Sequence, residues 1–110
     1  MNTTGEIDAV FGALADPRRR RVIELLGAGP RASGDLARAV SLPPPAMSRH
    51  LKVLRDSGLV AEDHSGADAR VRLYRLRPEA MTGLAGWIAE LEAAWSQELA
   101  AFKAHVEGER

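Results

Sequence analysis

Apolar residues recur along the chain with the spacing of amphipathic helices. A first helix is predicted from apolar residues at i, i+3, i+4 and i+7, namely Ile7, Val10, Phe11 and Leu14. Asp16 and Pro17 indicate the start of a second helix, because Asp is a favoured N-cap and proline at the first helical position loses no hydrogen bond. Residues 27–30, GAGP, end this helix. Its predicted core residues are Val22, Ile23, Leu25 and Leu26.

Two further helical patterns follow. Ser33 is a suitable N-cap for a short third helix, whose apolar residues are Leu36, Ala37 and Val40. After a tight turn at residues 41–43, a fourth helix is predicted over about residues 44–57, ending at Gly58. Consecutive prolines are tolerated in its first turn, where backbone N–H groups have no helical partner. Its predicted inward residues are Met47, Leu51 and Leu54.

A β-hairpin and one long helix complete the chain. Residues 59–62 and 71–76 favour strands, and the polar, glycine-containing segment 63–70 between them forms the tip. A last helix is predicted from Pro78 to about Val106. Its apolar stripe consists of Met81, Leu84, Ile88, Leu91, Trp95, Leu99, Phe102 and Val106.

The order of these elements predicts the fold class. Helix, helix, helix-turn-helix, hairpin and helix together indicate a mostly α protein with a small β-hairpin, that is, a winged helix-turn-helix. We expect one domain over residues 1–110. The helix-turn-helix would occupy about residues 33–57, the wing about 59–76 and the last helix about 78–106.

Composition excludes several classes of protein. The chain has 110 residues and no cysteine, so disulfides, thiolate metal sites, cysteine nucleophiles and thiol redox switches are absent. No segment approaches the ~20 apolar residues of a membrane span, and the first residues lack a signal-peptide pattern. We therefore expect a cytoplasmic protein. No phosphate loop, Ser–His–Asp spacing or paired carboxylates point to an enzyme.

The formal net charge of zero conceals an uneven distribution. Residues 17–77 carry 13 basic and six acidic side chains, a net charge of +7, whereas residues 78–110 carry a net charge of −4. A basic region attracts polyanions even when the whole protein is neutral. The plainer alternative is that these arginines only solvate helix faces. The four consecutive arginines at 18–21 point to all sides of their helix, so at most one or two of them would contact phosphate.

The fourth helix and the hairpin are placed to bind DNA. In a helix-turn-helix, the second helix lies in the major groove with its N-terminal half against base edges. Among the outward residues, Arg49 can read guanine through two hydrogen bonds, Ser48 can bind a base or a phosphate, and Lys52 is placed for a phosphate. Arg70 and Arg72 in the hairpin can grip the backbone or enter the minor groove.

Three segments resemble a known family. Residues 46–60, AMSRHLKVLRDSGLV, resemble the recognition-helix signature of the ArsR family of winged-helix repressors. Residues 14–26, LADPRRRRVIELL, are similar to its second-helix motif, and residues 72–76, RLYRL, fit its second wing strand. The resemblance implies a dimeric, operator-binding transcriptional regulator, usually a repressor released by a signal. We expect DNA contacts from Pro45, Ala46, Ser48, Arg49, His50, Lys52, Arg70 and Arg72. For His50, the residues favour packing within the helix, and a phosphate contact is the second option.

The chain departs from the metal-sensing members of that family. Those members carry a Cys-x-Cys-type pair at the start of the third helix, where this chain reads ASGDL at residues 32–36. Others bind zinc between paired terminal helices, whereas the last helix here offers His105 and a few glutamates, short of the about four ligands that zinc takes. We expect no metal and no other cofactor, as in a metal-site-free subgroup of the family.

The last helix predicts a homodimer. Its apolar stripe is roughly 40 Å long, too long for the preceding part of the chain to cover. The N- and C-terminal helices can pair across a two-fold axis, which would set two recognition helices about 34–36 Å apart, opposite a pseudo-palindrome. The predicted dimerisation residues are Ile7, Val10, Phe11, Leu84, Ile88, Leu91, Trp95, Leu99 and Phe102.

Two alternatives remain open. Trp87 and Trp95 pack either in core and dimer contacts or around an aromatic-lined effector pocket between the first and last helices. The winged helix can also serve as a protein–protein module that docks an acidic partner. DNA binding weakens steeply with salt and discriminates between duplexes, and docking to a protein shows no preference among duplexes.

Overall fold

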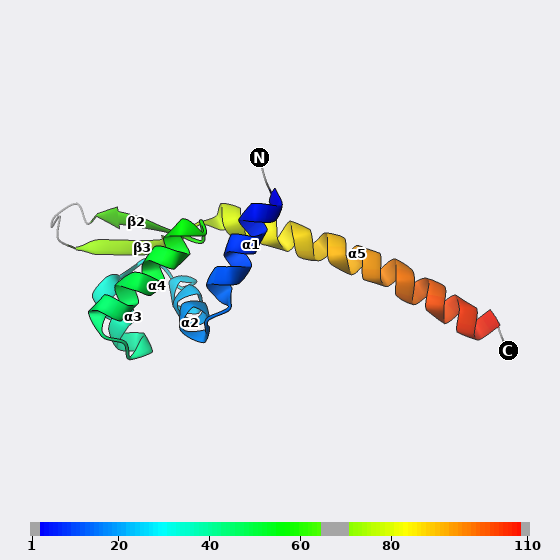
Figure 1. The fold of residues 1–110 in the computed structure, drawn as a ribbon, viewed down its shortest axis with the longest axis horizontal. Coiled ribbons are helices and arrows are strands. Elements are labelled where there is room, and N and C mark those ends of the chain that lie inside the picture. The colour runs from blue at the N-terminus through cyan, green and yellow to red at the C-terminus, as the bar shows by residue number, and fades with distance from the viewer. Residues whose placement is uncertain (1–2, 65–70, 109–110) are drawn as a thin grey trace.

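The structure combines helices with a small antiparallel sheet (Figure 1). The computed structural model describes residues 3–64 and 71–108. Its helices are α1 (Thr3–Leu14), α2 (Pro17–Leu26), α3 (Ser33–Val40), α4 (Pro44–Asp56) and α5 (Pro78–Gly108). Its strands are β1 (Arg31–Ala32), β2 (Val60–His64) and β3 (Arg72–Leu76). Each predicted helix is confirmed, and the two hairpin strands differ from the prediction only at their ends.

β3 is the central strand of the sheet, whose order is β1-β3-β2. It pairs antiparallel with β2, with Val60 opposite Leu76 and His64 opposite Arg72. On its other edge Arg31 of β1 lies opposite Tyr74. The sequence did not predict β1, because two residues are too few to show an alternating pattern.

The start of α2 follows the prediction and the start of α3 does not. Asp16 caps α2, since its Oδ1 accepts a hydrogen bond of 2.7 Å from the backbone N–H of Arg18. The N-cap of α3 is Ala32, which makes no side-chain capping bond, and Ser33 is the first helical residue. The predicted Ser33 cap is therefore wrong. The pairing of residues 31–32 with β3 fixes the chain up to Ala32, so the helix begins directly after the strand.

The core lies between the helices and the sheet. The predicted inward residues of α4 are at most 1% exposed, and Tyr74 of β3 is 5% exposed. Ile23, Leu25 and Val40 are half-buried and pack against this core. The buried residues are Val10, Ala13, Val22, Leu26, Leu36, Ala37, Met47, Leu51, Leu54, Leu59, Val60 and Tyr74.

α5 leaves this body and extends into solvent (Figure 1). The molecule measures 70 × 32 × 22 Å, and its radius of gyration is 19.1 Å. A globular chain of this length would have a radius of gyration of about 13 Å. Beyond Leu84, every described side chain of α5 except Leu91 is exposed. Among the described residues, no helix combines the length and apolar character that crossing a membrane requires.

Candidate nucleic-acid interface

The outer face of α4 presents the side chains predicted to read DNA. Because successive helical residues turn by about 100°, Pro45, Ser48, Arg49 and Lys52 fall on one side of the helix. All four are exposed, while the opposite side of α4 is buried in the core. Ala46 is half-buried beside this stripe. The structure thus brings together most of the predicted α4 contacts on one accessible surface.

Arg49 and Lys52 differ in what their side chains already contact. Within residues 3–64 and 71–108, the Arg49 side chain has no hydrogen-bond or ion-pair partner. The Nζ of Lys52 instead donates a hydrogen bond of 2.8 Å to Oδ2 of Asp56. Arg49 would therefore break no contact in forming a bidentate contact with a base, whereas Lys52 would have to leave Asp56 to bind a phosphate.

Asp56 is an acidic residue on this basic face that the sequence reasoning missed. The hydrogen bond from Lys52 is the main cause that lowers the pKa of Asp56, slight burial opposes it, and the charges of Lys52 and Arg55 add to the lowering. Asp56 is therefore an anion at neutral pH. The signal in the sequence was the i, i+4 spacing of Lys and Asp within a helix.

The wing is tied to the end of α4 through one carboxylate. Glu62 of β2 forms an ion pair with Arg55 of α4, and its Oε1 lies 3.2 Å from Nε of Arg72 in β3. The Glu62 side chain is only 13% exposed, whereas that of Arg72 is 58% exposed. Arg72 is thus accessible but already paired. Arg70, the other predicted wing contact, lies outside the described residues.

The same carboxylate affects the buried tyrosine of the sheet. Burial is the main cause that raises the pKa of Tyr74, and the negative charge of Glu62 raises it further. Arg55 and Arg72 act in the opposite direction. Arg55 and Arg72 both pair with Glu62, and these ion pairs offset the cost of placing its negative charge next to the core.

His50 lies at the inner edge of α4, away from the centre of the exposed stripe. It is half-buried, and its Nδ1 lies 3.1 Å from a guanidinium nitrogen of Arg19. This placement agrees with the packing alternative for His50. Of the four consecutive arginines, Arg19 and Arg20 donate to backbone carbonyls of α1, and Arg21 pairs with Glu24 at 3.1 Å. Sequence reasoning did not foresee the contacts with α1.

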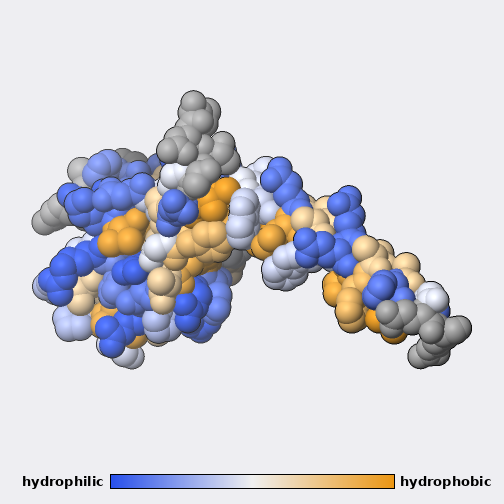
Figure 2. All heavy atoms as spheres, turned by 45° about the vertical axis from the view of Figure 1, so that its right-hand side comes forward, coloured by the Kyte–Doolittle hydropathy of each residue, from blue (hydrophilic) through white to orange (hydrophobic). Residues whose placement is uncertain are grey.

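The predicted dimerisation residues divide into buried and exposed groups. Val10 is 5% exposed and belongs to the core of the chain itself. Ile7, Leu84 and Leu91 are half-buried. Figure 2 shows apolar side chains along the projecting part of α5. The exposed members of the set are Phe11, Ile88, Trp95, Leu99 and Phe102, the last two at 67%.

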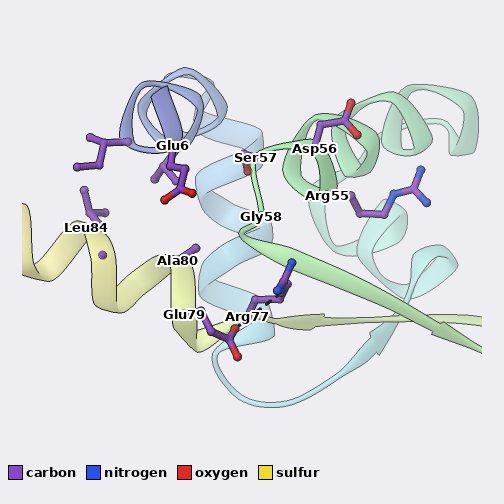
Figure 3. A pocket seen from close by; sticks show the side chains of 12 residues that line it. Glu6, Arg55, Asp56, Ser57, Gly58, Arg77, Glu79, Ala80 and Leu84 are labelled. Carbon is purple, nitrogen blue, oxygen red and sulfur yellow. Dashed lines mark ion pairs between the residues drawn. The ribbon is translucent and has the colours of Figure 1, made fainter. Parts of the chain in front are cut away.

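A pocket of about 400 Å³ lies between α1, the end of α4 and the start of α5 (Figure 3). Glu6 and Ile7 line it from α1, and Ala80 and Leu84 line it from α5. Its lining contains no aromatic side chain. Phe11 and Trp87 instead contact each other edge to face, with ring centroids 5.3 Å apart. This pocket is therefore not the aromatic-lined one that was the second alternative for Trp87 and Trp95, and the contact of Trp87 with Phe11 agrees with the packing alternative.

Among the described residues, no three His, Asp or Glu side chains converge in a way that could hold a metal ion. The predicted weak candidate, His105 on α5, lies on an exposed part of that helix.

Comparison with known proteins identifies the fold as that of transcription regulators. A family profile described as a helix-turn-helix domain matches residues 14–63, which span α2 to β2. The HTH-type transcriptional regulator Rv2034 of Mycobacterium tuberculosis is 38% identical over 109 residues, covering 99% of this chain and 96% of that protein. The transcriptional repressor SdpR of Bacillus subtilis is 33% identical over 57 residues, covering 52% of this chain and 63% of that protein.

Comparison with solved structures points to the same kind of protein. The ArsR family transcriptional regulator RHA00566 superposes with a TM-score of 0.76 at 32% identity, over 84% of this chain and 93% of that one. The homodimeric winged helix-turn-helix domain of Mb0332 from Mycobacterium bovis, a possible ArsR-family regulator, superposes with a TM-score of 0.65 at 26% identity, over 83% of each chain. Rv2034, SdpR and RHA00566 are named as transcriptional regulators or repressors, and Mb0332 as a possible one. The chain belongs to the ArsR family of winged helix-turn-helix transcriptional regulators.

Proposed function

We propose that the chain is a homodimeric repressor that binds an inverted-repeat operator through α4 and the wing, and that it does not respond to metal. The observation that carries this proposal is the exposed stripe on α4. Arg49 projects from it without a partner among the described residues, and Ser48 and Lys52 flank it. Such a stripe fits a helix that reads base edges and phosphates in the major groove. In this proposal residues 1–110 form one winged helix-turn-helix unit.

The exposed apolar face of α5 supports the homodimer. An isolated helix that carries Trp95, Leu99 and Phe102 in water leaves a large apolar area uncovered, which is a mark of an interaction surface. A second copy offers the same face, so a two-fold axis covers both at once. The homodimeric state of Mb0332 points the same way.

Repression and the lack of a metal response are supported by a relative and by the residues of the chain. SdpR is a repressor, which favours repression here. The chain has no cysteine, and its described His, Asp and Glu side chains do not converge, which favours an effector other than a metal or none at all.

Selection from random duplexes at about physiological salt, read by sequencing, tests the proposal. We expect an enriched inverted repeat whose half-sites lie about one helical turn apart. Enrichment of a single half-site would contradict the dimeric operator. No enrichment by folded, dimeric protein would favour docking of the basic face to an acidic protein instead.

A further inference from the structure

One arginine connects the end of α1 to the recognition helix. The Nε of Arg19, on α2, donates a hydrogen bond of 2.6 Å to the carbonyl of Ala13, and Nη2 donates one of 3.3 Å to that of Gly12. Its remaining nitrogen, Nη1, lies 3.1 Å from Nδ1 of His50 in α4. The three nitrogens of a single half-buried guanidinium therefore contact two different helices.

The contact with α1 has a clear physical cause. The last carbonyls of a helix have no helical partner, and α1 has no basic residue in its own last turn. Arg19 supplies a donor to the Ala13 carbonyl, adds a second one to the Gly12 carbonyl, which also accepts from the Ala15 N–H, and places a positive charge at the negative end of the helix dipole. A guanidinium is planar and its donors are fixed relative to one another, so binding α1 through two nitrogens fixes the direction of the third.

The root of the Arg19 side chain is also held in place. Its backbone N–H lies 3.4 Å from Oδ1 of Asp16, the N-cap of α2. Arg20 offers a natural comparison, because its Nη1 donates 2.7 Å to the carbonyl of Leu14, also at the end of α1. Arg20 is exposed, and this hydrogen bond reaches α1 but not α4.

We propose that Arg19 is a positioning residue that sets the orientation of α4 relative to α1. This inference rests on the proposed function, in which α4 enters the major groove and α5 forms the dimer, and α1 packs against α5 through Phe11 and Trp87. Any rotation of α4 against α1 is then repeated by the two-fold axis in the second subunit. Arg19 and His50 thereby set the spacing of the two recognition helices without touching DNA.

Binding to both half-sites depends on this spacing far more than binding to one. When two linked sites engage together, the second event is intramolecular, and its advantage is lost if the geometry does not match. Loss of the Arg19 contact should therefore weaken binding to a full operator and leave binding to an isolated half-site nearly unchanged.

The first test measures the geometry without DNA. Because the chain has no cysteine, Ala9→Cys on α1 and Lys52→Cys on α4, both at exposed positions, give two unique spin-label sites. Doubly labelled protein is diluted into unlabelled protein, so that each distance is measured within one chain. We expect one narrow distance distribution in this background and with Arg20→Gln, and a broadened or shifted one with Arg19→Gln. An unchanged distribution with Arg19→Gln would overturn the proposal.

His50→Ala and Arg19→Lys sharpen this test. His50→Ala removes the contact of Arg19 with α4 and leaves its bonds to α1, so it reports on the link even if Arg19→Gln does not fold. Lys keeps the charge but lacks the planar set of donors, and we expect it not to restore the narrow distribution. A narrow distribution in both variants would assign Arg19 a role in α1 alone.

The second test compares the selected full operator with a duplex that carries one half-site. We expect Arg19→Gln to weaken binding to the full operator about tenfold and binding to the half-site less than about twofold, since avidity depends on geometry. Equal losses on both duplexes, or the same pattern with Arg20→Gln, would overturn the positioning role. Failure of the wild type to select any repeat would contradict the proposed function instead, because the distance measurement needs no DNA.

Discussion

The ammonium of Lys52 lies 2.8 Å from the carboxylate of Asp56, one turn further along the exposed face of α4. Both side chains are about two-thirds exposed, at 67% and 65%. An ion pair this accessible to water contributes little to the stability of the fold. In the proposed complex with DNA, this ion pair would weaken binding, because it occupies the Lys52 ammonium and places the Asp56 carboxylate where phosphates would approach.

Removing the Asp56 charge should strengthen DNA binding. We expect Asp56→Asn to raise affinity several-fold for all duplexes alike, since it frees Lys52 and removes repulsion from phosphate.

Removing the Lys52 charge should have the opposite effect. Lys52→Ala should weaken binding to all duplexes alike and lower the slope of log affinity against log salt by about one. Salt titrations of duplex binding check both changes. Glu107→Gln, which removes the acid of the i, i+4 pair with Lys103 on α5, is the matched control. A sequence-selective loss with Lys52→Ala would contradict its phosphate role.

Arg49 should carry base selectivity. We expect Arg49→Ala to cost about 1–3 kcal/mol on the preferred operator and to relax the preference at one base position in each half-site. Repeating the duplex selection with the variant measures both effects. Arg21→Ala, which removes an exposed arginine of α2, should leave the preference intact. If Arg49→Ala selected the same sequence with the same discrimination, Arg49 would not read bases.

The projecting half of α5 should hold the dimer together. Trp95→Glu places a charge at the centre of the apolar stripe, and we expect monomers with weak operator binding because a buried, unpaired charge opposes association. Sedimentation measures the change. Gln97→Glu adds the same charge on the opposite side of the helix, about 160° away from Leu99, and should leave the dimer intact. An intact dimer in Trp95→Glu would place the interface elsewhere.

The pKa of Tyr74, the single tyrosine of the chain, reports on the charges of Glu62, Arg55 and Arg72 at the wing. Burial and Glu62 raise the pKa of Tyr74, so its contribution to stability is complete below pH ~10 and is lost as the pH rises through the folded-state pKa. We expect Glu62→Gln to lower the pKa of Tyr74, because it removes a negative charge and leaves Arg55 and Arg72 unpaired. Alkaline titration of the tyrosinate absorbance measures this shift, with Glu24→Gln on α2 as the control. If the pKa of Tyr74 did not fall, the charge of Glu62 would not contribute to raising it.

The elements that rest on local chemistry were predictable from the sequence. The cap at Asp16, the inward face of α4 and the long stripe of α5 follow from residue types and spacing, and the structure confirms them. The outer face of α4 follows by geometry once its inner face is known. Residues 31–32 form a strand only because β3 lies beside them, and this pairing also displaces the predicted cap at Ser33.

The contacts that link elements were not predictable. In the sequence Arg19 is one of four adjacent arginines, and only the approach of α1 and α4 distinguishes it from Arg18. Glu62 likewise looks like an ordinary polar residue of a strand. Its partners lie seven and ten residues away on other elements, and helical or strand periodicity carries no information about such pairs.

The prolines at the start of α4 limit how this helix can hold DNA. A helix ordinarily offers the free N–H groups of its first turn to an anion such as phosphate. Here the N-cap and the first two helical positions are Pro43, Pro44 and Pro45, which have no N–H, so only that of Ala46 remains before the helical bonding begins at Met47. In the proposed complex, α4 enters the groove with the backbone of its first turn fixed by proline and with few amide donors. Apart from the Ala46 N–H, its contacts with the phosphate backbone would therefore come from side chains, and substitutions of single surface residues would change its affinity.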